Sequence, residues 1–135
     1  MNDATLPADL VLRGARRLLA DLGAATLTEL PLADGRRADL IGLFRDGRLA
    51  IVEVKSGPAD FRADHKWPEY RAWCDRFYFG IPPGFPQPLL PENAGVIASD
   101  GFEAALLREA PEQALKPARR KAVTLRFARA AAARL

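Results

Sequence analysis

The pattern of apolar and polar positions divides the chain into segments with helical and extended periodicity. In residues 8–22, apolar side chains recur at spacings of four, three and four, which predicts an amphipathic helix ended by Gly23. A second helical region begins with Asp60 as its expected N-cap and is broken near a Trp-Pro pair. The predicted helices are 8–22, 59–75 and 117–133, and the predicted strands are 25–32, 38–44, 49–55, 76–81, 95–99 and 104–107. Residues 102–108 also fit a helical turn. The order predicts a mixed β-sheet flanked by helices, an α/β fold.

Residues 49–55 form an apolar run that is interrupted by one acidic residue and ends on a lysine. Such a run is typical of a central strand covered on both faces. Side chains alternate along a strand, so Glu53 and Lys55 share one face and the Val54 carbonyl lies between them. Burying such charges without partners costs several kcal/mol. The pattern therefore indicates that these two groups have partners.

An Asp-Gly pair between this strand and the preceding one predicts a hairpin, whose register decides where Asp39 lies. A two-residue loop would pair Asp39 with Val54. The side chain of Asp39 would then point to the other face of the sheet, away from Glu53, and no site would form. A three-residue loop, closed by Gly47 in the left-handed conformation, pairs Phe44 with Arg48 and sets Asp39 opposite Glu53. We favour the second register because it brings the charged groups together.

In that register the carboxylates of Asp39 and Glu53, the Val54 carbonyl and the Lys55 ammonium converge. Hard oxygen ligands of this kind suit Mg²⁺, with Mn²⁺ as an alternative, and a lysine beside them suits phosphodiester hydrolysis. The simpler interpretation is an internal ion pair between Lys55 and one carboxylate, without catalysis. Glu29 in the first strand is a further candidate metal ligand, although an exposed carboxylate on an edge strand is the commoner interpretation.

The helical region after the third strand passes close to Lys55, so Lys66 and Tyr70 are candidate contacts to substrate phosphate. Trp67, Tyr70 and Trp73 recur at three-residue spacing, which is compatible with a base-stacking platform but more often means packing against a sheet. His65 is the one histidine of the chain, and no partner at ligand spacing accompanies it, so we expect it at the surface.

Charge is distributed unevenly along the chain. The net charge is +3, but residues 112–135 carry +6 and the rest carries −3. A basic C-terminal helix favours a polyanion such as DNA, with Arg119, Arg120 and Lys121 as candidate contacts, although a solvated helix explains the same composition. The apolar positions expected to dock this helix on the sheet are Ala118, Ala122 and Leu125.

Length and composition predict a single domain over residues 1–135. With 135 residues and 49% hydrophobic content, the chain can bury a substantial core. The sequence predicts neither a membrane span nor a signal peptide, and its single cysteine, Cys74, excludes an internal disulfide. We therefore expect a cytoplasmic protein.

Two families resemble the chain at the residues singled out above. Residues 8–81 resemble the core of the PD-(D/E)XK nuclease superfamily, with Asp39 at its first acidic position and Glu53-Val54-Lys55 as its E-x-K. The chain resembles more closely, along nearly its whole length, the bacterial MmcB-like family of DNA repair endonucleases. The residues that carry this second resemblance are Arg36 to Asp39, Glu53 to Ser56, Ala59 to Asp64, Lys66, Trp67, Tyr70, Cys74 and Asp75. Ala38 stands where many superfamily members have proline, which leaves the carboxylate unaffected.

These resemblances imply a restriction-endonuclease-like fold with an α-β-β-β-α-β core, followed here by further strands and the C-terminal helix. They also imply a magnesium-dependent endonuclease that acts on DNA during repair, as a homodimer or with other repair proteins. The alternative is a nucleic-acid-binding module on the same fold, catalytically silent, that delivers DNA to a partner enzyme. Asp39, Glu53 and Lys55 favour the nuclease, because carboxylates beside phosphate repel it and a binding module has no use for them.

Overall fold

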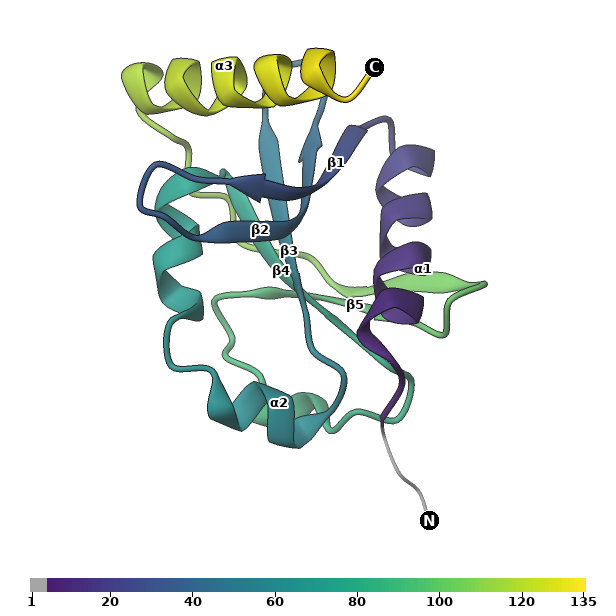
Figure 1. Ribbon diagram of the computed structural model, residues 1–135. Helices are drawn as coiled ribbons and strands as arrows, with labels where there is room; N and C mark the ends of the chain where they lie inside the picture. Colours follow the sequence, from purple (N-terminus) through teal and green to yellow (C-terminus); the bar gives the residue numbers. More distant parts are fainter. Residues whose placement is uncertain (1–4) are drawn as a thin grey trace.

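Six strands in chain order form one mixed sheet, with helices on both faces and across one end (Figure 1). The computed structural model describes residues 5–135. Strands β1 to β3 are antiparallel, β3 to β5 are parallel, and β6 returns antiparallel to β5. The elements are α1 (Ala8–Asp21), β1 (Ala25–Pro31), β2 (Arg37–Leu43), β3 (Leu49–Val54), α2 (Pro58–Ala63), the 3-10 helix η1 (Trp67–Trp73), β4 (Arg76–Ile81), the short 3-10 helix η2 (Gln87–Leu89), β5 (Gly95–Ser99), β6 (Ala104–Arg108) and α3 (Pro117–Ala133). The predicted α/β fold with a helix-flanked mixed sheet is confirmed.

The β2–β3 hairpin has the register that the sequence favoured. The Phe44 N–H donates to the Arg48 carbonyl at 2.9 Å, and the Gly47 N–H donates to the Phe44 carbonyl at 3.0 Å. Gly47 has φ 89°, the left-handed conformation that closes a three-residue loop. Continuing the observed pairing along both strands sets Asp39 opposite Glu53.

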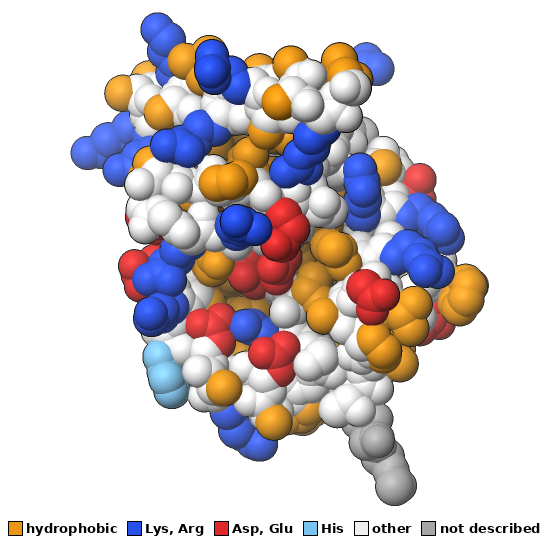
Figure 2. Space-filling view, in the orientation of Figure 1, with side chains coloured by type: hydrophobic (Ala, Val, Ile, Leu, Met, Phe, Trp, Pro, Cys, Tyr) orange, Lys and Arg blue, Asp and Glu red, His pale blue; other side chains and the backbone are white. Residues whose placement is uncertain are grey.

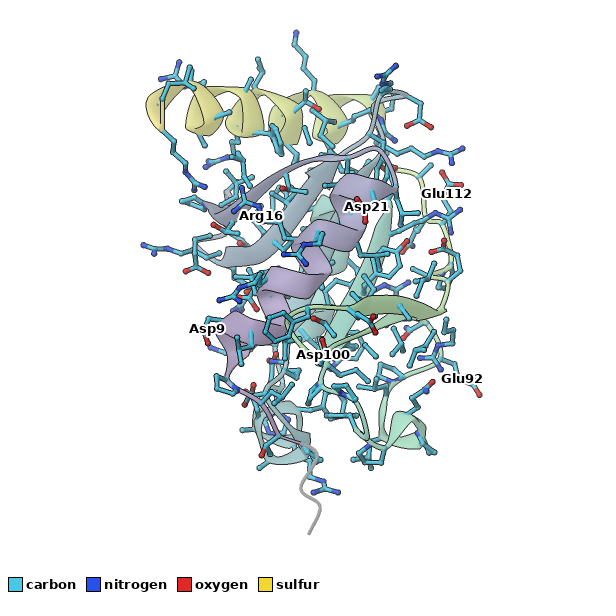
Figure 3. The ribbon with its side chains drawn as sticks, turned by 90° about the vertical axis from the view of Figure 1, so that its right-hand side faces the viewer. Asp9, Arg16, Asp21, Glu92, Asp100 and Glu112 are labelled. Atoms are coloured by element: carbon cyan, nitrogen blue, oxygen red, sulfur yellow. The ribbon has the colours of Figure 1, made fainter. Side chains whose placement is uncertain are left out.

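Each face of the sheet has its own apolar core. On one face, α1 buries Val11, Ala15 and Leu19 and lies across the strands, as the side view in Figure 3 shows. On the other face, Trp67 and Tyr70 of η1 lie nearly parallel to the Phe77 ring, with centroids at 5.7 and 6.3 Å. The packing interpretation of these two aromatic side chains is therefore the correct one.

Two local predictions about helices are wrong. Helix α2 has Gly57 as its N-cap and starts at Pro58, because proline is favoured in the first turn. Asp60 lies inside that turn, and its carboxylate accepts the Ser56 N–H at 2.9 Å. Helix α3 docks through Val123 and Phe127, which are buried, whereas its three predicted docking residues are exposed: Ala118, Ala122 and Leu125.

A buried ion pair fastens α3 to the end of the sheet. Asp75 is 1% exposed, and its carboxylate accepts hydrogen bonds from both terminal guanidinium nitrogens of Arg120, at 2.6 and 2.7 Å. It also accepts the backbone N–H groups of Leu49 and Leu115. Burial acts to raise the pKa of Asp75, but the hydrogen bonds from Arg120 and the backbone outweigh it and hold this pKa below its ordinary value. Arg120 therefore has a structural role, and its contact with DNA stays a prediction.

Within residues 5–135, none of the helices combines the length and the apolar character needed to span a membrane.

Candidate functional site

Where the backbone pairing of β2 and β3 ends, side-chain carboxylates accept the backbone N–H groups. The paired register ends at Leu40 and Val52. One position further, the Asp39 N–H donates to Glu53 Oε2 at 2.9 Å, and the Val54 N–H donates to Asp39 Oδ2 at 2.9 Å. Figure 2 shows acidic side chains gathered in a hollow of this face, between the β1–β2 pair and α2. The two strands thus hold both carboxylates side by side through reciprocal hydrogen bonds.

Both carboxyl groups are held in surroundings that disfavour their charge. Glu53 is 5% exposed, and burial, followed by the charge of Asp39, raises its pKa to about 9. Burial also raises the pKa of the half-buried Asp39. At neutral pH the pair on its own therefore holds a proton, and a positive charge placed between the two groups would displace it.

Lys55 is the third member of the predicted site, and its partner is a residue that the sequence analysis did not assign. The lysine is 7% exposed, and its Nζ lies 2.6 Å from Asp64 Oδ2. Among the residues that the structure describes, neither Asp39 nor Glu53 pairs with this ammonium. Its charge is near enough to oppose the raising effect of burial on the pKa of both carboxyls. The simpler interpretation, an ion pair of Lys55 with one of those two carboxylates, is therefore wrong, because the lysine pairs with Asp64 instead.

Asp64 lies in the connection between α2 and η1, nine positions after Lys55. Burial acts to raise its pKa, but the hydrogen bonds from Lys55 and from the N–H groups of Lys66 and Trp67 outweigh this effect and lower it. One feature of the sequence indicates that Asp64 matters: it is among the residues that carry the family resemblance and lies shortly before the expected break in the helix. That signal did not reveal the partner, because the contact depends on how the chain folds back.

Glu29 lies near the pair without joining it. It has φ 53°, its side chain is 56% exposed, and its carboxylate is 4.0 Å from Arg37. Across residues 5–135, no group of three or more aspartate, glutamate, histidine or cysteine side chains is arranged to hold a metal ion. A cation at Asp39 and Glu53 would thus complete its coordination with backbone or solvent oxygen, such as the predicted Val54 carbonyl.

Helix η1 closes one side of the site. The Tyr70 hydroxyl donates to the Arg37 carbonyl at 2.9 Å, and Arg36 donates to Glu69 at 2.6 Å. Burial, followed by the charges of Glu53 and Asp39, raises the pKa of Tyr70, which places its hydroxyl within the field of the two carboxyls. The predicted role of Tyr70 in binding phosphate stays a prediction.

The remaining residues predicted to contact DNA are either exposed at the surface or bound to other groups of the protein. Lys66 and Lys121 are exposed, and His65 lies at the surface, as the sequence predicted. Arg119 stacks over the Trp73 ring at 4.1 Å and donates to the Ala72 carbonyl. DNA binding by Lys66, Arg119 and Lys121 stays a prediction.

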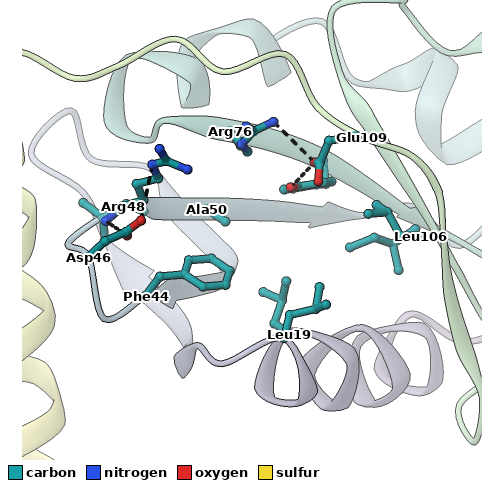
Figure 4. A pocket seen from close by; sticks show the side chains of 12 residues that line it. Leu19, Phe44, Asp46, Arg48, Ala50, Arg76, Leu106 and Glu109 are labelled. Atoms are coloured by element: carbon teal, nitrogen blue, oxygen red, sulfur yellow. Dashed lines mark hydrogen bonds and ion pairs between the residues drawn. The ribbon is translucent and has the colours of Figure 1, made fainter.

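A separate cavity of about 290 Å³ lies on the α1 side of the sheet (Figure 4). Leu19, Phe44 and Leu106 form part of its apolar wall. Its polar groups bind one another, since Glu109 accepts a hydrogen bond from Tyr78 and pairs with Arg76 at 3.7 Å. None of the predicted site residues lines it.

Comparison with known proteins gives one family and one close structure. A family model described as DNA repair protein MmcB-like matches residues 4–135. A solved structure of a protein of unknown function from Silicibacter pomeroyi shares 41% sequence identity and superposes with a TM-score of 0.90, covering 96% of this chain and 88% of the other. The curated proteins include no match.

Proposed function

This chain belongs to the MmcB-like family of DNA repair proteins, and we propose that it is a metal-dependent DNA endonuclease that hydrolyses phosphodiester bonds. The observation that carries the proposal is the pair of carboxylates held opposite one another at the end of β2 and β3, with a buried lysine beside them. A purely structural role explains this arrangement poorly, because the fold raises the pKa of Asp39 and Glu53 instead of stabilising their charge.

The donor set fits a hard divalent cation. One oxygen of each carboxylate accepts a backbone N–H, which fixes both groups and leaves the second oxygen of each for a metal. Asp39, Glu53 and the Val54 carbonyl would hold Mg²⁺ or Mn²⁺, ions that keep several waters and bind through one or two carboxylates. Such an ion, when bound, lowers the pKa of a coordinated water and neutralises charge that develops on phosphate.

The side chains of the protein have separate tasks in this proposal. Asp39 and Glu53 would hold the ion, and Glu53 would release its proton to solvent on binding it. The Lys55 ammonium donates a hydrogen bond to the attacked phosphate, where negative charge accumulates in the transition state. Because Lys55 is mostly buried, solvent screens its charge weakly, and this charge acts on a phosphate in the hollow against the partial offset from the Asp64 carboxylate.

The same residues support placement in the PD-(D/E)XK superfamily. Asp39 takes the first acidic position and Glu53-Val54-Lys55 take the E-x-K, on neighbouring strands whose register sets the two acids opposite one another. The order α1, β1, β2, β3, α2, β4 matches the core that this superfamily implies.

Incubation with a panel of nicked, flapped, branched and single-stranded DNAs tests the proposed activity. We expect wild-type protein to cut at least one of them in Mg²⁺ or Mn²⁺ and none in excess chelator. Glu92→Gln, which changes an exposed glutamate elsewhere, is the matched control for Glu53→Gln. Binding without cleavage by wild-type protein in both metals would reject the nuclease and support the DNA-binding module.

A further inference from the structure

We infer that Asp64 is a positioning residue that holds the Lys55 ammonium away from Asp39 and Glu53, so that both carboxylates stay available to a cation. This inference rests on the proposed nuclease function. It concerns Asp64, the carboxylate that pairs with Lys55 among the described residues and to which the sequence analysis gave no role.

The contacts of Asp64 divide between its two oxygens. Oδ2 lies 2.6 Å from Lys55 Nζ. The lysine side chain is 8% exposed and the aspartate side chain is 19% exposed. Oδ1 accepts the N–H groups of Lys66 at 2.8 Å and Trp67 at 3.1 Å. One carboxylate thus joins the ammonium to the backbone that starts η1, and both of its oxygens are bound.

The core fixes both ends of this contact. Lys55 directly follows β3, and its N–H donates to the Gly80 carbonyl of β4 at 2.9 Å. On the other side, Trp67 lies nearly parallel to the Phe77 ring, with an angle of 13° between the planes, so the segment that carries Asp64 is packed on the same sheet. Neither partner can move far without disturbing apolar packing.

Removal of Asp64 would leave the ammonium among two other carboxylates. Lys55 already lies close enough for its charge to act on Asp39 and Glu53. A buried ammonium that loses its partner turns to the nearest acceptor, because an unpaired charge is costly. Pairing with Asp39 or Glu53 would occupy an oxygen that the cation requires and withdraw the ammonium from the phosphate.

Asp64→Asn separates the two tasks of the side chain. Asparagine keeps an Oδ1 that accepts the Lys66 and Trp67 N–H groups, but it presents an amide donor to Lys55 in place of a carboxylate. Asp60→Asn is the matched control, since Asp60 lies in the same segment, binds the Ser56 N–H and makes no ion pair with a described residue. Asp64→Ser, whose hydroxyl can also accept from the backbone, is the second variant if the first fails to fold.

Two measurements test the inference. On a DNA that wild-type protein cuts, we expect Asp64→Asn to lower kcat by about 10-fold to 100-fold, the range for loss of an orienting partner, with KM changed by less than about 3-fold because DNA contacts outside the site persist. In the absence of DNA, we expect the ¹⁵N ammonium signal of Lys55 to be visible by NMR at the same position in wild-type protein and in Asp60→Asn, and shifted in Asp64→Asn because the ammonium then pairs with Asp39 or Glu53.

The inference and the proposed function are contradicted by different outcomes. Unchanged kcat in a folded Asp64→Asn variant would overturn the inference while leaving the nuclease intact. If wild-type protein cut no DNA, the proposed function would fail instead. Titration with Mn²⁺ alone would then decide the inference: weaker Mn²⁺ binding by Asp64→Asn supports it, and equal binding with an unaltered Lys55 signal overturns it.

Discussion

Replacing Glu53 with glutamine in the metal-free protein is expected to change how stability depends on pH. Burial and the charge of Asp39 raise the pKa of Glu53 from 4.5 to about 9 in the folded protein. Between these two values the folded state keeps a proton that the unfolded chain has lost. The stabilising contribution of the protonated group is therefore complete below the unfolded pKa and is lost as pH rises toward the folded one.

The magnitude follows from one proton bound by the folded state and released by the unfolded chain. The free energy of unfolding should fall by about 1.4 kcal/mol per pH unit through this group, or about 4 kcal/mol from pH 5 to pH 8. Glu53→Gln has no proton to lose and should lack this slope. Asp39 also contributes to the wild-type curve because burial raises its pKa, and since the two carboxyls interact, the difference between the two proteins reports the proton that the pair holds.

Urea denaturation across this pH range, in the presence of a chelator, measures both slopes. Glu92→Gln should follow the wild-type curve, because it removes an exposed carboxylate. Parallel curves for wild type and Glu53→Gln would show that Glu53 is ionised in the folded protein, and the account of a proton-holding pair would be wrong.

Three further substitutions probe the framework of the site. Arg120→Ala leaves Asp75 buried without its ionic partner and should lower the free energy of unfolding by about 3 kcal/mol in urea; a change below about 1 kcal/mol would contradict the structural role of this pair. Gly47→Ala meets no neighbouring atom but must adopt φ 89°, so a loss of about 1 kcal/mol is expected, and an unchanged denaturation midpoint would argue against the three-residue loop. Neutralising Arg119 and Lys121 together should weaken duplex binding for every sequence and flatten its dependence on log salt by about 0.9 for each phosphate that the variant no longer neutralises; an unaltered slope would leave α3 without a role in binding DNA.

Turn chemistry and strand alternation allowed the central geometry to be predicted from sequence. Only a loop closed by Gly47 in the left-handed conformation sets Asp39 opposite Glu53, and the structure has that loop. The period of two then places Lys55 on the same face as Glu53. These features are local, so a few residues of sequence determine them.

Features that depend on contacts between distant segments could not be predicted in this way. The partner of Lys55 is Asp64, in a segment that is held on the sheet by the packing of Trp67 of η1 against Phe77 of β4. Likewise, the sequence shows Arg120 as one of several basic residues in its segment, but in the structure its guanidinium binds Asp75, 45 positions earlier. Composition gives the charge of a segment but does not show which charges are already paired inside the fold.

The central claim is that Asp39 and Glu53 hold a divalent cation that the protein needs to cleave DNA. A paired measurement on Glu53→Gln tests this claim most directly. Its DNA affinity and its single-turnover cleavage rate in Mn²⁺ would be compared with those of wild-type protein on the same substrate. We predict that cleavage is abolished while affinity is unchanged or higher, because the substitution removes a metal ligand and an acidic group from the phosphate path. Cleavage by Glu53→Gln at the wild-type rate, with contamination excluded by a mock purification from cells that lack the protein, would contradict the claim.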